Sequence, residues 1–438
     1  MEKAIKYLHK AGEQAAQRSA NTEAITHLTT ALELLTTLPD TPERSRQELR
    51  LLLTLGVPLS TTRGNSSPEV GATYTRAREL CQQLGETRQF FPVLFGLRLF
   101  HSVQNELLPA CELAEQLLDL AQKEQDPTLL MEAYRASGNT VFHLGEFETA
   151  YAHLAQSLIL YDAQHHHSQV HLYGGLEPGV IGLSYTALVL WHLGYPDQAL
   201  QKSGAARSLA RELARPFSLA TAAFFAAVLY QLCREDELTQ ECADVAVALA
   251  TEHGFPQWLG QATVLQGWAL GKQEQQAEGI RQIHQGLAAN QAAKIGMFHS
   301  YYLALLAEAY GKAGQVEEGL TTLADALGVM DKSGERFYEA EVYRLRGELT
   351  LAQSRVQSRE SSVQKEAGEC FWKAIEVARK QQAKSLELRA VMSLARLWQQ
   401  QGKKTEAHQL LSKIYTWFTE GFDTKDLQEA KTLLNELS

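Results

Sequence analysis

Apolar residues recur along the chain at the spacing of amphipathic helices, and these helices come in pairs. Within Val180–Leu193, the residues Ile181, Leu188 and Trp191 are spaced to share one helical face. A second helix is expected over Pro196–Leu213, because proline and aspartate are favoured in the first turn of a helix. A glycine between the two helices supplies the tight turn. The pattern therefore predicts a helical hairpin.

The hairpin pattern repeats about every 40 residues. Each unit has a glycine, four mostly polar residues and a small residue that opens the second helix. The residue seven positions after that small residue serves as one landmark per unit. The landmarks are Ala31, Ala77, Leu117, Ser157, Ala206, Ala246, Gly286, Ala326, Ala374 and Ile414. A fixed period of this length predicts an all-α, right-handed superhelical solenoid of about ten helical hairpins.

We expect a single solenoid over residues 1–438 rather than several domains. Its parts are an uncapped first unit (1–39), units two to four (40–164), an insertion (165–179), units five to eight with the start of nine (180–351), a low-complexity insertion (352–366) and the C-terminal units (367–438). Ile5, Leu8, Ile25, Leu28 and Leu32 form an apolar stripe in the first unit. A solenoid end normally carries a polar cap, so we expect either a covering partner or a chain cut from a larger protein.

The unit that starts at Ser300 resembles a tetratricopeptide repeat. Its eighth, eleventh, fifteenth, twentieth and twenty-seventh positions are Ala307, Tyr310, Gly314, Gly319 and Ala326. The period is 40 residues rather than the 34 of that repeat, which implies longer helices. Segments such as 303–311, 334–341 and 393–398 resemble the C-terminal repeat region of bacterial multidomain signalling ATPases and adenylyl-guanylyl cyclases, whose catalytic domains are missing here.

This resemblance implies a non-catalytic interaction or sensor solenoid in bacterial signal transduction. Such a solenoid would bind a partner protein, a peptide or a small ligand and regulate an NTPase or nucleotide cyclase module, in cis or in trans. The alternative is an enzyme whose active site is built across repeats without a local motif.

In tetratricopeptide solenoids, positions two, five, nine, twelve and thirteen of each unit line a concave groove. By this register the candidate groove residues are Arg135, Asn139, His143, Ser184, Trp191, His192, Phe224, Gln231, Trp268, Tyr301, Glu308, Glu341, Arg344 and Glu348. Large aromatic residues flanked by polar ones suit a peptide or a small molecule. The alternative is that Trp191, Phe224 and Trp268 simply pack between units.

Composition narrows the partners. The chain is 45% hydrophobic and 21% charged with a net charge of -10, which disfavours direct binding of nucleic acid. Its five cysteines are scattered without a C-x-x-C pair, as in reduced cytoplasmic proteins. The uncharged stretch 216–233 fits a buried helix of the repeat better than a membrane span. Charges within residues 1–8 interrupt any apolar run of signal-peptide length, so secretion is not expected. We therefore expect a cytoplasmic protein without a membrane partner.

Motifs for catalysis and cofactor binding are absent from the sequence. The string Gly402-Lys403-Lys404-Thr405 lacks the first glycine of a phosphate-binding loop and lies at a repeat turn. The histidine-rich string 165–171 has no carboxylate or thiolate support, so we interpret it as a polar loop rather than a metal site. No catalytic residue, cofactor or metal is expected, and the chain is predicted not to be an enzyme.

Overall fold

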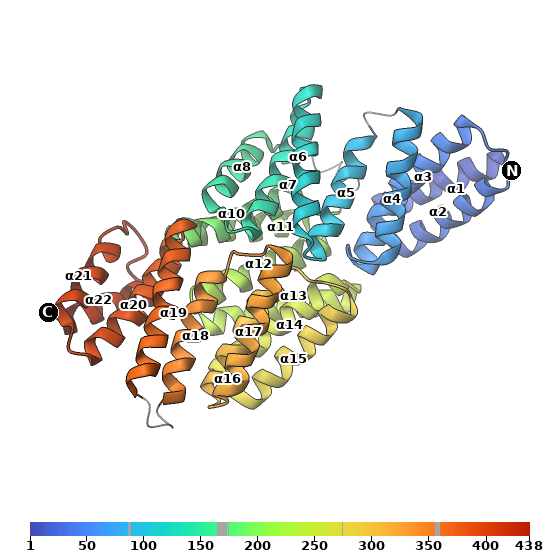
Figure 1. Ribbon diagram of the computed structural model, residues 1–438. Helices are drawn as coiled ribbons and strands as arrows, with labels where there is room; N and C mark the ends of the chain where they lie inside the picture. The colour runs from blue at the N-terminus through green and yellow to red at the C-terminus, as the bar shows by residue number, and fades with distance from the viewer. Residues whose placement is uncertain (86–88, 164–172, 174, 274, 355–359) are drawn as a thin grey trace.

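The computed structural model describes residues 1–85, 89–163, 173, 175–273, 275–354 and 360–438. Over these residues the chain forms 21 helices in consecutive antiparallel pairs and no β-strand. The predicted all-α, tetratricopeptide-like solenoid is thus confirmed. The two ends of the chain lie at opposite ends of the molecule (Figure 1).

The first helices of the hairpins form the inner layer. They are α1 (Glu2–Gln17), α3 (Pro42–Arg63), α5 (Phe90–Val103), α7 (Pro127–His143), α10 (Pro178–Leu193), α12 (Pro216–Leu232), α14 (Pro256–Lys272), α16 (His299–Lys312), α18 (Glu339–Ser354), α20 (Lys384–Gln400) and α22 (Lys425–Leu437). The central ones are buried on nearly all sides. In α10 and α12, for example, most side chains from the first turn to the last are buried.

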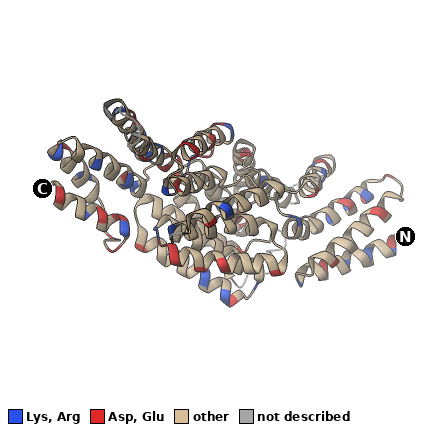
Figure 2. Ribbon diagram, turned by 90° about the horizontal axis from the view of Figure 1, so that it is seen from below, with Lys and Arg blue, Asp and Glu red and all other residues tan. Residues whose placement is uncertain are grey.

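The second helices form the outer layer. They are α2 (Asn21–Thr36), α4 (Pro68–Leu84), α6 (Leu107–Glu124), α8 (Phe147–Leu160), α11 (Pro196–Leu213), α13 (Asp236–His253), α15 (Gln276–Ala292), α17 (Val316–Ser333), α19 (Glu360–Lys380) and α21 (Lys404–Tyr415). Each buries one stripe and exposes the opposite face to solvent. Acidic and basic residues are interspersed on the helices near both termini (Figure 2).

Prolines and glycines set the ends of these helices. Seven of the 11 prolines stand at the first residue of a helix, where their missing N–H is not needed. Asp126 caps α7, because its carboxylate accepts a bond of 2.8 Å from the Thr128 N–H. Gly194 ends α10 with φ of 92°, a left-handed conformation that glycine adopts without strain.

The landmark residues, most of which are small, lie where the two helices of a unit approach each other. All ten are buried. The closest approach is at Gly286, where an added Cβ would lie 2.6 Å from the Gly260 carbonyl oxygen and 2.8 Å from the Val264 nitrogen. The backbones of α14 and α15 therefore touch directly, with no room for a side chain between them.

The solenoid coils so that each turn packs on the next. We call this line of contacts the seam. Along it, the C-terminal end of one first helix meets the N-terminal end of the first helix five hairpins later: α3 meets α14, α5 meets α16, α7 meets α18, α10 meets α20 and α12 meets α22. One superhelical turn therefore takes five hairpins. The hydrogen bonds of the seam include those from Gly296 N to Val103 O (2.8 Å), from Arg336 N to His143 O (2.7 Å) and from Ser385 Oγ to Trp191 O (2.5 Å).

The first hairpin buries much of the apolar stripe that the sequence suggested would be left bare. Ile5 and Leu28 are 3% and 0% exposed, and Leu8, Ile25 and Leu32 are partly buried. The reason is that α1 packs on both α2 and α3, which cover this stripe from two sides.

The two predicted insertions are described only in part. Helix α18 ends at Ser354 and α19 already begins at Glu360, so part of the low-complexity string is helical. The rest of that string, 355–359, and the histidine-rich string 165–171 lie outside the described residues. The uncharged stretch that begins at Pro216 forms α12, and no described helix is both long and apolar enough to cross a membrane.

Candidate functional site

Most of the candidate groove residues lie inside the coil rather than on an open surface. Eleven of the fourteen are buried, and the other three are partly buried: Glu308, Arg344 and Glu348. Trp191, Phe224 and Trp268 are 3%, 0% and 2% exposed. Trp191 and Phe224 thus pack within the molecule and line no part of the cavity described below, whereas Trp268 lines that cavity.

The seam explains this burial. Where one turn covers the next, aromatic side chains from both turns fill the concave side: the rings of Phe142 and Phe337 are 5.1 Å apart, and those of His143 and Phe298 are 4.9 Å apart. Arg389 of α20 lies over the Trp191 ring at 4.9 Å. The first part of the predicted groove is therefore a packed interior wall.

The polar side chains in this wall are held by local partners. Arg135 pairs with Glu132, one helical turn before it, through its Nε at 2.8 Å. His192 Nδ1 donates to the Leu188 carbonyl at 2.7 Å, and burial lowers the pKa of His192 to about 3. His192 is therefore a neutral, buried group at neutral pH. His143 accepts or donates a bond of 3.1 Å with the Tyr185 hydroxyl.

The concave side opens into a cavity of about 400 Å³ over the later units. We call it the concave cavity. The first helices α14, α16, α18 and α20 form its walls, and α12 and α22 meet across the seam at one side. The candidate groove residues that line it are Gln231, Trp268, Glu308, Glu341, Arg344 and Glu348. The remaining eight candidates are outside its lining.

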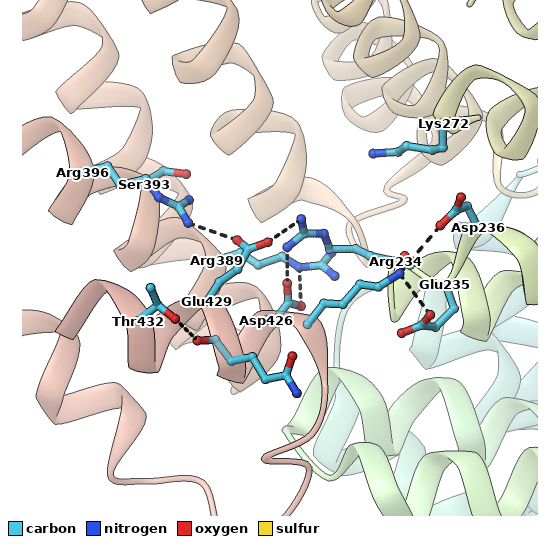
Figure 3. Close-up of polar contacts among 12 residues, drawn as sticks. Arg234, Glu235, Asp236, Lys272, Arg389, Ser393, Arg396, Asp426, Glu429 and Thr432 are labelled. Carbon is cyan, nitrogen blue, oxygen red and sulfur yellow. Dashed lines mark hydrogen bonds and ion pairs between the residues drawn. The ribbon is translucent and has the colours of Figure 1, made fainter. Parts of the chain in front are cut away.

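Arginines and carboxylates bind one another along the side of the concave cavity next to the seam (Figure 3). Asp426 accepts from Arg389 Nε at 2.8 Å and from Arg234 Nη1 at 3.1 Å. Glu429 contacts Arg234 Nη2 at 2.8 Å and Arg396 Nη2 at 3.0 Å. Because Arg234 follows α12 and the acids belong to α22, this network ties the last helix to the preceding turn.

A second set of charges lies on α14, α16 and α18. Lys272 Nζ is 2.5 Å from Glu308 Oε1, and the Trp268 indole N–H donates to Glu308 Oε2 at 2.8 Å. Burial disfavours the charge of Glu308, but Lys272 and these hydrogen bonds prevail and lower its pKa to about 2. Arg344 holds Glu341 in a two-pronged contact, at 2.7 Å and 2.9 Å.

Sequence reasoning missed several cavity residues although its own register reaches them. Lys272 and Lys312 are the thirteenth residues of the units that start at 260 and 300, and so fall on a groove position. In the unit that starts at 388, positions two, five and nine are Arg389, Met392 and Arg396. Arg234, Asp426 and Glu429 lie outside this register, because they join the cavity through the seam.

Other candidate chemistry found in the sequence forms no site. The Gly402-Lys403-Lys404-Thr405 string runs from the turn between α20 and α21 into the first two residues of α21. Among the described residues, no group of three or more His, Cys, Asp or Glu side chains is placed to hold a metal ion. Burial raises the pKa of Cys233 to about 12, which keeps this thiol protonated.

Comparison with known proteins finds a relative in sequence. It is an uncharacterized protein of Rhizobium meliloti (strain 1021), 26% identical over 403 residues. The match covers 91% of this chain and 38% of the relative, so the chain spans little more than a third of that protein's length. No protein-family model matches the chain.

Comparison of structures supports the fold. A crystal structure of Rap protein complexed with competence and sporulation factor matches with a TM-score of 0.52 and 14% identity, over 84% of this chain and 100% of that one. A signal transduction ATPase with numerous domains from Pyrococcus horikoshii, which carries a tetratricopeptide repeat sensor, matches with a TM-score of 0.45 and 12% identity. That match covers 92% of this chain and 57% of that one. The first match shows a shared helical-repeat fold.

Proposed function

We propose that this chain is a non-catalytic sensor and interaction solenoid of a bacterial signal-transduction system. It binds a protein segment, a peptide or a small molecule in the concave cavity and regulates an NTPase or nucleotide cyclase module, in cis or in trans. The observation that carries the proposal is the cavity itself: a hollow of about 400 Å³ on the concave side, lined by both charged and apolar side chains from successive units.

The position of the cavity suggests how binding would be transmitted. Its walls come from four successive units, and Arg234 and Asp426 bring in two helices from either side of the seam. A ligand that contacts several units binds best at one spacing of those units, and so favours one pitch of the superhelix. A module attached to either end of the coil would then change its orientation when ligand binds.

The chemistry of the cavity favours binding over catalysis. Its carboxylates are engaged in ion pairs, and the one serine in its lining, Ser393, donates its hydroxyl to Glu348 at 2.6 Å. The neighbouring thiol of Cys233 is kept protonated by burial. These groups are thus stabilised as ion-pair and hydrogen-bond partners rather than activated as nucleophiles. The alternative remains an enzyme with a site built across repeats.

The length of the Rhizobium relative is in keeping with an attached module, since the match covers only 38% of that protein. To test the absence of catalysis, the purified chain would be incubated with ATP or GTP and Mg²⁺. We expect no nucleoside diphosphate and no cyclic nucleotide above a protein-free control. Turnover of ATP or GTP that co-purifies with the chain would overturn the proposal of a non-catalytic function.

The binding part of the proposal has its own test. A panel of amino acids, short peptides and small acids is screened by the rise in melting temperature. Compounds that stabilise the wild-type chain should lose their effect in Met392→Trp, which fills the cavity, and keep it in Leu200→Trp, which lies on the exposed side of α11. Equal effects in both variants would place binding outside the cavity.

A further inference from the structure

The charges that line the concave cavity do not balance. Six cationic side chains face five carboxylates: Arg234, Lys272, Lys312, Arg344, Arg389 and Arg396 against Glu308, Glu341, Glu348, Asp426 and Glu429. Five of the cations form ion pairs with these carboxylates. Among the described residues, Lys312 is the lining cation that has no ion pair within 4.0 Å. The surplus positive charge therefore lies at Lys312.

The local geometry explains why Lys312 has no carboxylate partner. It follows Glu308 by one helical turn of α16, a spacing at which lysine and glutamate commonly pair. Both oxygens of Glu308 are already taken, Oε1 by Lys272 and Oε2 by the Trp268 indole. Lys312 is left beside Lys272 at the rim of the cavity, where it is exposed.

The titration of Lys312 agrees with this crowding. Desolvation and the positive charge of Lys272 lower its pKa to about 8, against the opposing effect of Glu308 and Asp236. The charged groups that face it are Lys272 of α14, Glu308 of its own helix, Asp236 of α13 and, across the cavity, Arg344 of α18. A bound anion would relieve the repulsion between the two ammonium groups.

We propose that the concave cavity takes a small organic acid, whose carboxylate binds between Lys272 and Lys312. One negative charge would balance the surplus cation. The apolar part of the acid lies against Leu345, Leu349 and Met392, which line the same cavity. This assignment rests on the proposed function and specifies the ligand of its site.

Other ligand classes fit less well. A cationic ligand would have to displace an arginine or lysine from a carboxylate, because each acid in the lining already has a cation. Inorganic phosphate would satisfy the lysines but would leave the leucine and methionine surface uncovered. The volume of about 400 Å³ suits a small molecule rather than a folded domain.

Three probes with the same six-carbon chain isolate the contribution of the head group: hexanoate, hexylammonium and 1-hexanol. Inorganic phosphate is the fourth probe. Dissociation constants are measured at pH 7 by titration calorimetry or by chemical-shift changes. We expect hexanoate to bind more tightly than 1-hexanol and phosphate, and hexylammonium to bind least. Equal affinity for hexanoate and 1-hexanol, or preference for hexylammonium, would overturn the assignment.

Two substitutions at the lysine pair have opposite expected effects. Lys312→Met removes the surplus charge and should weaken hexanoate about tenfold, whereas Lys332→Met, an exposed lysine of α17, should leave it unchanged. Glu308→Gln removes the carboxylate charge beside Lys272 and Lys312 and keeps an oxygen that can accept from the Trp268 indole. It should therefore raise the affinity for hexanoate severalfold. If Lys312 and Glu308 served only to stabilise the fold, the two substitutions would not change the affinity for hexanoate in opposite directions.

The outcomes separate this assignment from the proposed function. If phosphate binds as tightly as hexanoate and its affinity changes in the same way in Lys312→Met and Glu308→Gln, the cavity binds anions without preference for an organic acid. The assignment of an organic acid would then be wrong. If a neutral or cationic compound binds in the cavity instead, the sensor function stands while the acid assignment is overturned. Hexanoate binding that Lys312→Met leaves intact would place the carboxylate elsewhere and refute the site.

Discussion

The repeat register makes a direct prediction about glycines in helices. Gly286 is the landmark of its unit, and an added Cβ would lie 2.6 Å from the Gly260 carbonyl oxygen. Gly328 is also inside a helix, but it is exposed and has no atom within 4 Å of an added Cβ. The substitutions Gly286→Ala and Gly328→Ala therefore make the same chemical change in two different surroundings.

The expected free energies of unfolding follow from two effects. Alanine favours a helix over glycine by about 1 kcal/mol at either position. At Gly286 the methyl group meets backbone atoms that cannot rotate away, so overpacking costs about 2–3 kcal/mol. Gly328→Ala should therefore stabilise by about 1 kcal/mol and Gly286→Ala should destabilise by about 1–2 kcal/mol.

Urea unfolding followed by circular dichroism measures both changes, and hydrogen exchange of α14 and α15 locates the second. Because repeat arrays can unfold in parts, the local exchange rates are the safer measure of the Gly286 effect. If both variants change stability in the same direction and by the same amount, the landmark does not mark a close approach. The unit boundaries would then be misplaced.

Three further predictions concern buried or crowded charges. Burial lowers the pKa of His192 to about 3, so below pH 6.5 the unfolded chain binds a proton that the folded chain does not. The free energy of unfolding should therefore fall as the pH drops below 6.5, and it should fall less in His192→Leu. Urea unfolding at pH 7 and at pH 5 measures both. Arg389→Leu should destabilise by about 1.5–3 kcal/mol, because it removes the 2.8 Å partner of the Asp426 carboxylate and leaves it Arg234 at 3.1 Å, whereas Lys365→Gln, in an exposed pair, should change nothing measurable. The affinity for hexanoate should fall as the pH rises through about 8, because Lys312 loses its proton there. Near pH 8.5 hexanoate should bind together with a proton, and calorimetry in two buffers of different ionisation enthalpy should detect this uptake.

The sequence predicts the hairpins well because their determinants are local. Helical periodicity, a proline at the first turn, as in Pro196, and a glycine with positive φ, as in Gly194, are all encoded within one unit. Close packing of two helices likewise requires small residues at the landmark, and Ala246 and Ala326 are fully buried there. These features need no knowledge of distant parts of the chain.

The closure of the coil could not be read from the sequence in the same way. Ser385 bonds to the Trp191 carbonyl, and Arg389 bonds to the Leu232 carbonyl, across one full superhelical turn. Such pairs depend on the pitch of the superhelix, which accumulates from small rotations in every unit. For this reason the repeat register predicts Trp191 on a groove surface, while in the structure α20 covers it.

The candidate site was predicted in part for the same reason. Glu308 and Arg344 follow from the groove positions of a unit, and the thirteenth position of that register also reaches Lys312. The contribution of Arg234 and Asp426 depends on the seam. That Lys312 has no partner depends on which atoms Lys272 and Trp268 occupy on Glu308, a detail of side-chain geometry.

The most direct test of the central claim is hydrogen exchange of the full chain with and without saturating hexanoate. A ligand held in the concave cavity should slow exchange in α14, α16, α18 and α20, which form its walls, and leave α2 and α4 unchanged. Slower exchange confined to the outer helices, or no change in any of these four helices at saturation, would contradict binding in the cavity.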